Sequence, residues 1–77
     1  MGRIDRIRAR LVAGEDVSYR EAVTLLEYAC DCWRSGAGSH RVYVLGPGRL
    51  VLSRPKGGRL KPYQRRDIVR FLDQHGG

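Results

Sequence analysis

The sequence has no long hydrophobic run and only two cysteines, two histidines and two lysines. Its apolar runs fall well short of the roughly 20 residues that span a bilayer, so we expect no targeting segment, no membrane span and no membrane partner. Cys30 and Cys32 are too few for a disulfide framework, and in a strand they would point to opposite faces. We therefore expect free, buried thiols in a reducing cytoplasm, with no metal site and no cofactor.

Acidic residues are scarce in the second part of the chain. Residues 1–32 hold five basic and six acidic side chains, whereas residues 33–77 hold ten basic and two acidic ones. The net charge of +7 therefore belongs to the second part, where we expect the surface that binds a polyanion. A chain of 77 residues forms one small domain, residues 1–77, so an active site should lie in a surface groove.

Arginine outnumbers lysine by thirteen to two. The guanidinium group matches phosphate with a planar fork of donors and stacks on bases, which favours nucleic acid over a membrane surface. Codon bias in a GC-rich genome would give the same excess of arginine, and a basic surface can also serve solubility alone.

Helical periodicity appears three times along the chain. Apolar residues at helical spacing predict an amphipathic helix over residues 3–13, which Gly14 ends. The Ser18-Tyr19-Arg20-Glu21 segment fits a capping box and predicts a helix to residue 29 or 30. Pro62 suits the first turn of a last helix, which runs to about residue 74.

Strand-forming residues occupy the middle of the chain. The pattern predicts strands over 32–34, 39–45 and 49–53, with glycine-containing turns between them and a basic loop over 54–61. The expected fold class is α+β, with a three-stranded antiparallel sheet and helices on one face. Residues 18–75 follow the α-β-β-β-α order of the double-stranded-RNA-binding fold, and residues 3–13 add an N-terminal helix.

His40 is the side chain beside the basic region that titrates near neutral pH, so it is a candidate general acid or base. Arg41, Lys56 or Lys61 could supply positive charge to a reacting phosphate. A lone histidine is more often a plain surface or core residue, and strand alternation does not decide which face His40 takes. His75, near the C-terminus, is not expected to act in catalysis.

The basic region also holds residues that could contact RNA. Tyr63, in the first turn of the last helix, is the best candidate for stacking on a base, whereas Trp33 and Tyr43 are expected in the core or the sheet. The expected RNA-binding residues are Ser39, Arg41, Arg54, Lys56, Arg59, Lys61, Tyr63 and Arg65.

Two segments carry a resemblance to a known family. Gly38-Ser39-His40-Arg41-Val42-Tyr43 resembles the Gly-Ser-His-x-x-aromatic signature of HicA toxins. The segment Gly58-Arg59-Leu60-Lys61-Pro62-Tyr63-Gln64, followed by a helix, is similar to the loop and helix start of one HicA subgroup. That subgroup also has an extra N-terminal helix. Arg41 and Arg49 stand where many members have further histidines or lysines, and the turn at residues 46–48 is short.

The resemblance implies a double-stranded-RNA-binding-like fold and a toxin of a type II toxin-antitoxin system. Such toxins are mRNA interferases that a HicB antitoxin neutralises, and the histidine of the signature, here His40, is their catalytic residue. The leading hypothesis is therefore a cytoplasmic, metal-independent endoribonuclease. The alternatives are a non-catalytic RNA-binding module that uses the same basic face, and an interaction subunit whose basic face docks an acidic partner.

Overall fold

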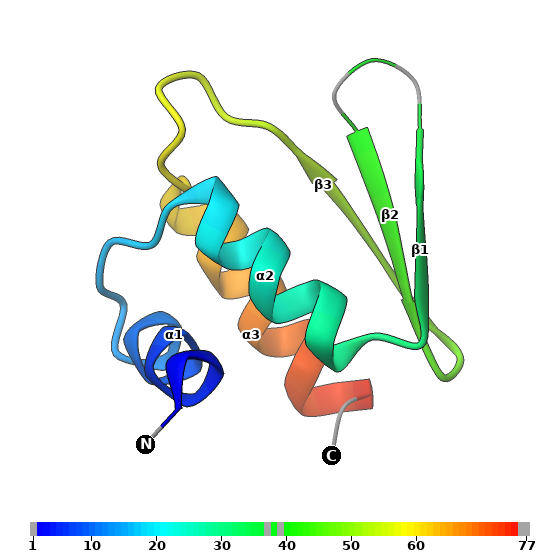
Figure 1. Cartoon of the computed structure of the whole chain (residues 1–77), viewed down its shortest axis with the longest axis horizontal. Helices are drawn as coiled ribbons and strands as arrows, with labels where there is room; N and C mark the ends of the chain where they lie inside the picture. Colours follow the sequence, from blue (N-terminus) through cyan, green and yellow to red (C-terminus); the bar gives the residue numbers. More distant parts are fainter. Residues whose placement is uncertain (1, 37, 39, 76–77) are drawn as a thin grey trace.

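The computed structural model describes residues 2–36, 38 and 40–75, and contains three helices and one antiparallel sheet (Figure 1). The α+β class expected from the sequence is confirmed. In chain order the elements are α1 (Arg3–Val12), α2 (Tyr19–Ala29), β1 (Cys32–Ser35), β2 (His40–Leu45), β3 (Gly48–Ser53) and α3 (Pro62–His75). The predicted boundaries agree to within about one residue, the usual uncertainty at fraying ends.

Strand β2 is the centre of the sheet, and β1 and β3 flank it in the order β1-β2-β3. Both pairs are antiparallel, with Tyr43 opposite Trp33 on one side and Leu50 on the other. Alternation turns Tyr43, Leu45, Leu50 and Leu52 into the core, where each is at most 9% exposed. The opposite face of the sheet has no helix over it (Figure 1).

Helices α2 and α3 cover one face of the sheet, whereas α1 packs against these two helices on their far side (Figure 1). The expectation of helices on one face is thus confirmed, with α1 as an outer layer. Ile7 and Leu11 of α1 are buried, so this helix belongs to the common core.

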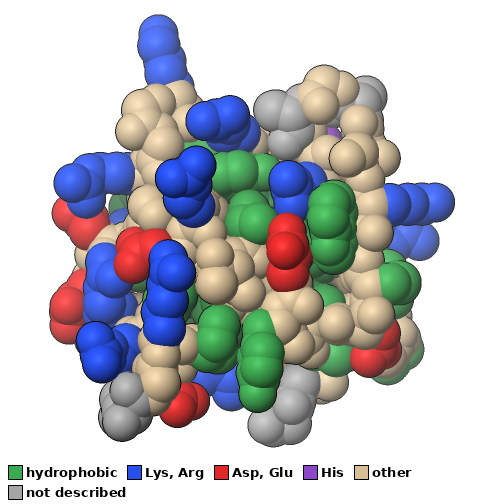
Figure 2. Space-filling view, viewed as in Figure 1, with side chains coloured by type: hydrophobic (Ala, Val, Ile, Leu, Met, Phe, Trp, Pro, Cys, Tyr) green, Lys and Arg blue, Asp and Glu red, His purple; other side chains and the backbone are tan. Residues whose placement is uncertain are grey.

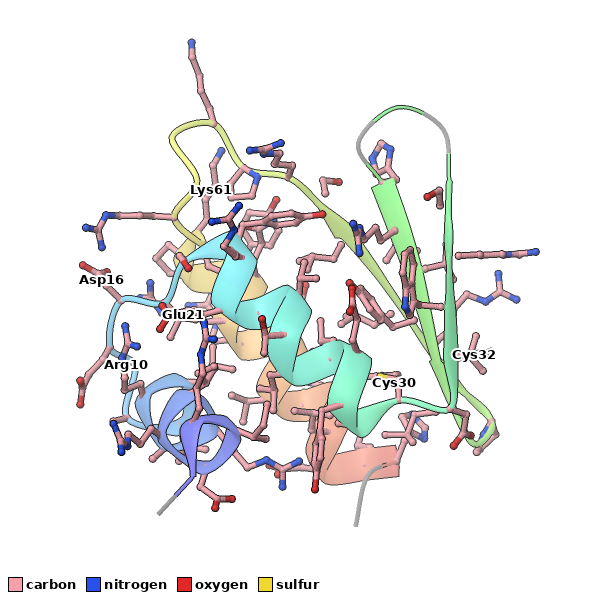
Figure 3. The ribbon with its side chains drawn as sticks, viewed as in Figure 1. Arg10, Asp16, Glu21, Cys30, Cys32 and Lys61 are labelled. Atoms are coloured by element: carbon pink, nitrogen blue, oxygen red, sulfur yellow. The ribbon has the colours of Figure 1, made fainter. Side chains whose placement is uncertain are left out.

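The capping box at the start of α2 is confirmed. The Glu21 N–H donates to the Ser18 hydroxyl at 3.0 Å, and the Ser18 N–H donates to the Glu21 carboxylate at 3.1 Å. Arg10 of α1 donates to the same carboxylate at 2.6 Å, which ties α1 to the start of α2 (Figure 3).

The two cysteines are free thiols near the start of the edge strand β1 (Figure 3). Cys30 is half-buried, and burial together with the charges of Asp31 and Cys32 raises its pKa to about 11. Cys32 is exposed, so the expectation of a buried thiol is wrong there, because its side chain lies on the face of the sheet that no helix covers. Within residues 2–36, 38 and 40–75, none of the helices is long and apolar enough to cross a bilayer.

Candidate nucleic-acid interface

His40 is the first residue of β2 and lies opposite Ser53, the last residue of β3. The backbone N–H of Gly36 donates to the His40 carbonyl at 2.8 Å and closes the end of the β1–β2 hairpin. A side chain at Gly36 would crowd the Cβ atom of His40, since an added Cβ would lie 3.3 Å from it. The His40 side chain is exposed at this end of the sheet.

The pairing register of β2 decides on which face of the sheet the His40 side chain lies, a question that the sequence left open. Arg41 shares the helix-covered face with the buried Tyr43, whereas His40 shares the other face with Val42. Because β2 begins at His40, both His40 and Arg41 still reach one depression at the strand end. This solvent-open depression of about 240 Å³ is lined by Tyr19, Ser35, Gly38, His40, Arg41 and Arg54.

Arg41 is held by two contacts that leave part of its guanidinium open to solvent. It donates to the Glu27 carboxylate of α2 at 3.0 Å, and it lies 4.3 Å from the centroid of the Trp33 ring. Its side chain keeps 30% exposure. Each contact contributes about 0.5–1 kcal/mol at an exposed site, so together they orient the group more than they stabilise the fold.

Tyr43 lies below this arginine in the core. Its hydroxyl is buried and has no hydrogen-bond partner among the described residues. Burial raises the pKa of Tyr43, and the nearby Arg41 guanidinium opposes that rise. The phenol therefore stays neutral at physiological pH, and the ion-pair partner of Arg41 is Glu27.

Arg54 reaches the depression from the loop that follows β3. Its guanidinium lies 6.0 Å from the centroid of the Tyr19 ring, at the start of α2. Two backbone hydrogen bonds hold this loop against the start of α2 and the residues before it. The Tyr19 N–H donates to the Gly58 carbonyl at 2.7 Å, and the Leu60 N–H donates to the Val17 carbonyl at 3.0 Å. The loop conformation therefore places Arg54 beside Tyr19.

Gln64 fixes the other end of this loop from inside α3. It is 5% exposed, its amide nitrogen donates to the Ser53 carbonyl at 3.0 Å, and its amide oxygen accepts from the Lys61 N–H at 2.9 Å. Buried amides of this kind are costly to leave unpaired, so Gln64 holds the end of β3 and the start of α3 together. This assigns a structural role to the last residue of the Gly58–Gln64 segment.

A second depression, of about 290 Å³, continues from the first across the start of α2. The two share Tyr19, Arg41 and Arg54, and the second adds Ser18, Arg20, Val23, Thr24 and Gly58. We call the two together the His40 groove. Its described lining residues include His40 and three arginines but no carboxylate, so its field favours an anionic ligand.

The other residues expected to bind RNA lie elsewhere. Arg59 and Arg65 each lie 3.7 Å from Asp16, in the connection between α1 and α2, and Tyr63 lines a depression beside β3. Lys56 and Lys61 are exposed on the loop before α3 and do not line the His40 groove. Figure 3 shows Lys61 on this loop. Ser39 lies outside the described residues.

Sequence reasoning did not identify Tyr19, Arg20 or Ser35 as part of this site. The only local signal for Tyr19 was its place directly after the helix cap, since its contact with Arg54 depends on the packing of a loop 35 residues away in the chain. Trp33 and Tyr43 do lie in the sheet as expected, with Tyr43 in the core and Trp33 41% exposed.

Among the residues that the structure describes, no group of three or more His, Cys, Asp or Glu side chains could hold a metal ion. In comparisons with protein-family models, curated proteins and solved structures, no match to this chain was found.

Proposed function

We propose that this protein is a cytoplasmic toxin of a type II toxin-antitoxin system, similar to HicA, that cleaves mRNA without a metal ion and is neutralised by a HicB-like antitoxin. The observation that carries the proposal is the meeting of an exposed His40 with Arg41 and Arg54 in one solvent-open depression. A phosphodiester in this depression would find a proton-transfer group and two cations together.

In the proposed reaction, His40 accepts the proton of a ribose 2′-hydroxyl. The 2′-oxygen attacks the adjacent phosphorus, and the bond between phosphorus and the 5′-oxygen breaks. The leaving 5′-oxygen takes up a proton from solvent or from a second group in the groove. The products are a 2′,3′-cyclic phosphate and a free 5′-hydroxyl, so no metal and no redox partner take part.

Arg41 and Arg54 act in this mechanism by stabilising the extra negative charge of the phosphorane. Arg41 suits this role because Glu27 and Trp33 already orient its guanidinium, so little side-chain entropy is lost when phosphate binds. The ring of Tyr19, which lines the groove beside Arg54, offers a surface on which a neighbouring base can stack.

The deciding experiment compares the purified protein with His40→Ala in the cleavage of a radiolabelled RNA. We expect a loss of about 100-fold or more in rate, because a general acid-base group contributes that much. Circular dichroism should be unchanged, since the His40 side chain is exposed. Arg49→Ala, which removes an exposed cation outside the groove, is the matched control and should cut at the parental rate.

The ends of the cleaved RNA provide a second readout, and the proposal requires 2′,3′-cyclic phosphate. Equal cleavage by the parent protein and His40→Ala would refute the catalytic role of His40. A parent protein that binds RNA through the groove and never cuts it would identify a non-catalytic RNA-binding module instead.

A further inference from the structure

A depression of about 610 Å³ lies between α1 and α3, away from the His40 groove. It adjoins a smaller one of about 30 Å³, with which it shares Leu11, Val69 and Asp73. We call the two together the α1–α3 groove. No lining residue is common to it and the His40 groove, and α1 lies far from the start of β2 (Figure 1).

The floor of the α1–α3 groove is apolar. Leu11 comes from α1, Val69 and Leu72 come from α3, and the exposed Val12 of α1 borders them. Val12 is 68% exposed although it adjoins the buried Leu11 and the part-buried Val69. An aliphatic side chain left exposed at the edge of a hydrophobic floor is typical of a surface that a partner covers.

The rim of the groove is basic. Exposed Arg8 comes from α1 and exposed Arg66 and Arg70 come from α3, whereas the part-buried Arg65 faces Asp16. Asp73 is the one carboxylate among the described lining residues. Figure 2 shows basic side chains spread over the side of the molecule where α1 lies, with a few acidic ones between them. The rim therefore favours a partner with several negative charges.

The shape of the groove selects a helix as the occupant. Both walls are helices, whose backbone groups are already paired, so an extended strand would find no backbone partners here. A helix satisfies its own backbone and can place apolar residues at i, i+3, i+4 and i+7 on the floor. None of the described lining residues is aromatic, so the groove offers no surface for stacking a nucleic-acid base.

From these observations we infer that the α1–α3 groove is a docking site for an acidic amphipathic helix of a partner protein. Apolar residues of that helix cover Leu11, Val12 and Val69, and its glutamates or aspartates pair with Arg8, Arg66 and Arg70. Because the two grooves share no lining residue, a bound helix leaves His40 open to solvent. The inference does not depend on the proposed nuclease activity.

The test uses a synthetic peptide of about 15 residues, a length that matches the 14 residues of α3. The peptide carries leucines at helical spacing with glutamates on both sides of the apolar stripe, and a fluorescent label reports its binding by anisotropy. A peptide of the same composition in scrambled order keeps the charge and loses the stripe. We expect the ordered peptide to bind at least tenfold more tightly than the scrambled one.

Two protein variants locate the site. Arg66→Glu/Arg70→Glu should weaken binding of the ordered peptide at least tenfold, and Val12→Glu should weaken it as well, since each changes an exposed residue of the groove. Arg34→Glu/Arg49→Glu makes the same charge change on exposed strand residues and should leave the affinity within about twofold. If the parent protein cleaves RNA, the cleavage rate of each variant is measured separately from its affinity for the peptide.

Failure of the ordered peptide to bind, or equal binding of the scrambled peptide, would overturn the inference. Equal weakening by Arg34→Glu/Arg49→Glu would also overturn it, because the attraction would then come from net charge alone. Displacement of bound RNA by the peptide, with Arg66→Glu/Arg70→Glu losing RNA affinity, would assign the groove to nucleic acid instead. None of these results bears on whether His40 cleaves RNA.

Discussion

The guanidinium of Arg41 lies 4.3 Å from the centroid of the Trp33 ring, across the pair formed by β1 and β2. Trp33 is the only tryptophan of the chain. Its fluorescence therefore reports on the environment of Arg41 without any added label. This contact connects the sheet to the His40 groove, because Arg41 lines the groove and Trp33 supports it.

An oligonucleotide that binds in the His40 groove should change the emission of Trp33. A 2′-deoxy oligonucleotide is the suitable ligand, since it has no hydroxyl with which to react. Arg41→Ala should remove most of the change and lower the affinity about tenfold, because it removes a charge-assisted contact to phosphate. Arg49→Ala is the control and should retain the signal. Binding seen by another method with no change in emission would place the nucleic acid elsewhere.

His75, the last residue of α3, covers the backbone of Gly48 at the start of β3, and its ring lies 5.5 Å from that of Phe71. A methyl group at Gly48 would overlap the His75 ring. We expect Gly48→Ala to lower the free energy of unfolding by about 1–3 kcal/mol, the usual cost of overpacking. Urea denaturation measures this change.

Combining Gly48→Ala with His75→Ala should restore part of that loss, because the small side chain at residue 75 removes the overlap. The two substitutions should therefore be non-additive in a double-mutant cycle. Purely additive losses would show that the backbone of β3, and not the imidazole ring, resists the extra methyl group.

The Glu21 carboxylate should make stability sensitive to acid. Its hydrogen bond with the Ser18 backbone, and next that with Arg10, lower the pKa of Glu21 below the ordinary value of 4.5. The ionised Glu21 carboxylate therefore contributes its full stabilisation above pH 4.5. This stabilisation is lost as the pH falls through the lower pKa that Glu21 has in the folded protein. Glu21→Gln retains a capping group but removes the charge, at a cost of about 0.5–1 kcal/mol at pH 7.

Thermal unfolding followed from pH 7 down to strongly acid conditions tests this prediction. The difference in Tm between the parent protein and Glu21→Gln should shrink as the pH falls below 4.5. If the difference in Tm between the parent protein and Glu21→Gln does not change with pH, the charge of Glu21 does not stabilise the fold.

Local chemistry made most of the secondary structure predictable. The capping box at Ser18 depends on residues three apart, and the glycine-containing turns and alternating strands depend on near neighbours as well. The structure pairs the strands in chain order, β1-β2-β3, as short connections between adjacent antiparallel strands favour. The burial of Cys32 was predicted wrongly because the sequence alone did not show which face of an edge strand would remain uncovered.

The candidate site was less predictable, because its members meet through tertiary packing. His40 and Arg41 are neighbours in sequence, yet Arg54 and Tyr19 join them only when the loop after β3 pairs with the start of α2. Of the remaining basic residues, Arg65 turns away to Asp16 and its side chain is only 16% exposed. The positions of charged residues along the chain do not show which of them lie close together in the folded protein.

The choice of His40 as the candidate for catalysis depends on the resemblance of its segment to the HicA signature. The sequence by itself determined the α+β class, the order of the elements and the excess of positive charge. Each of these depends on composition or on residues close together in the chain. Only the tertiary structure decided which cations share a groove with His40, and it brought Arg8 from the first part of the chain beside Arg66 and Arg70 from the second. The physical reason is that helix packing brings together side chains that lie far apart in the sequence, whereas charge and periodicity report only local order.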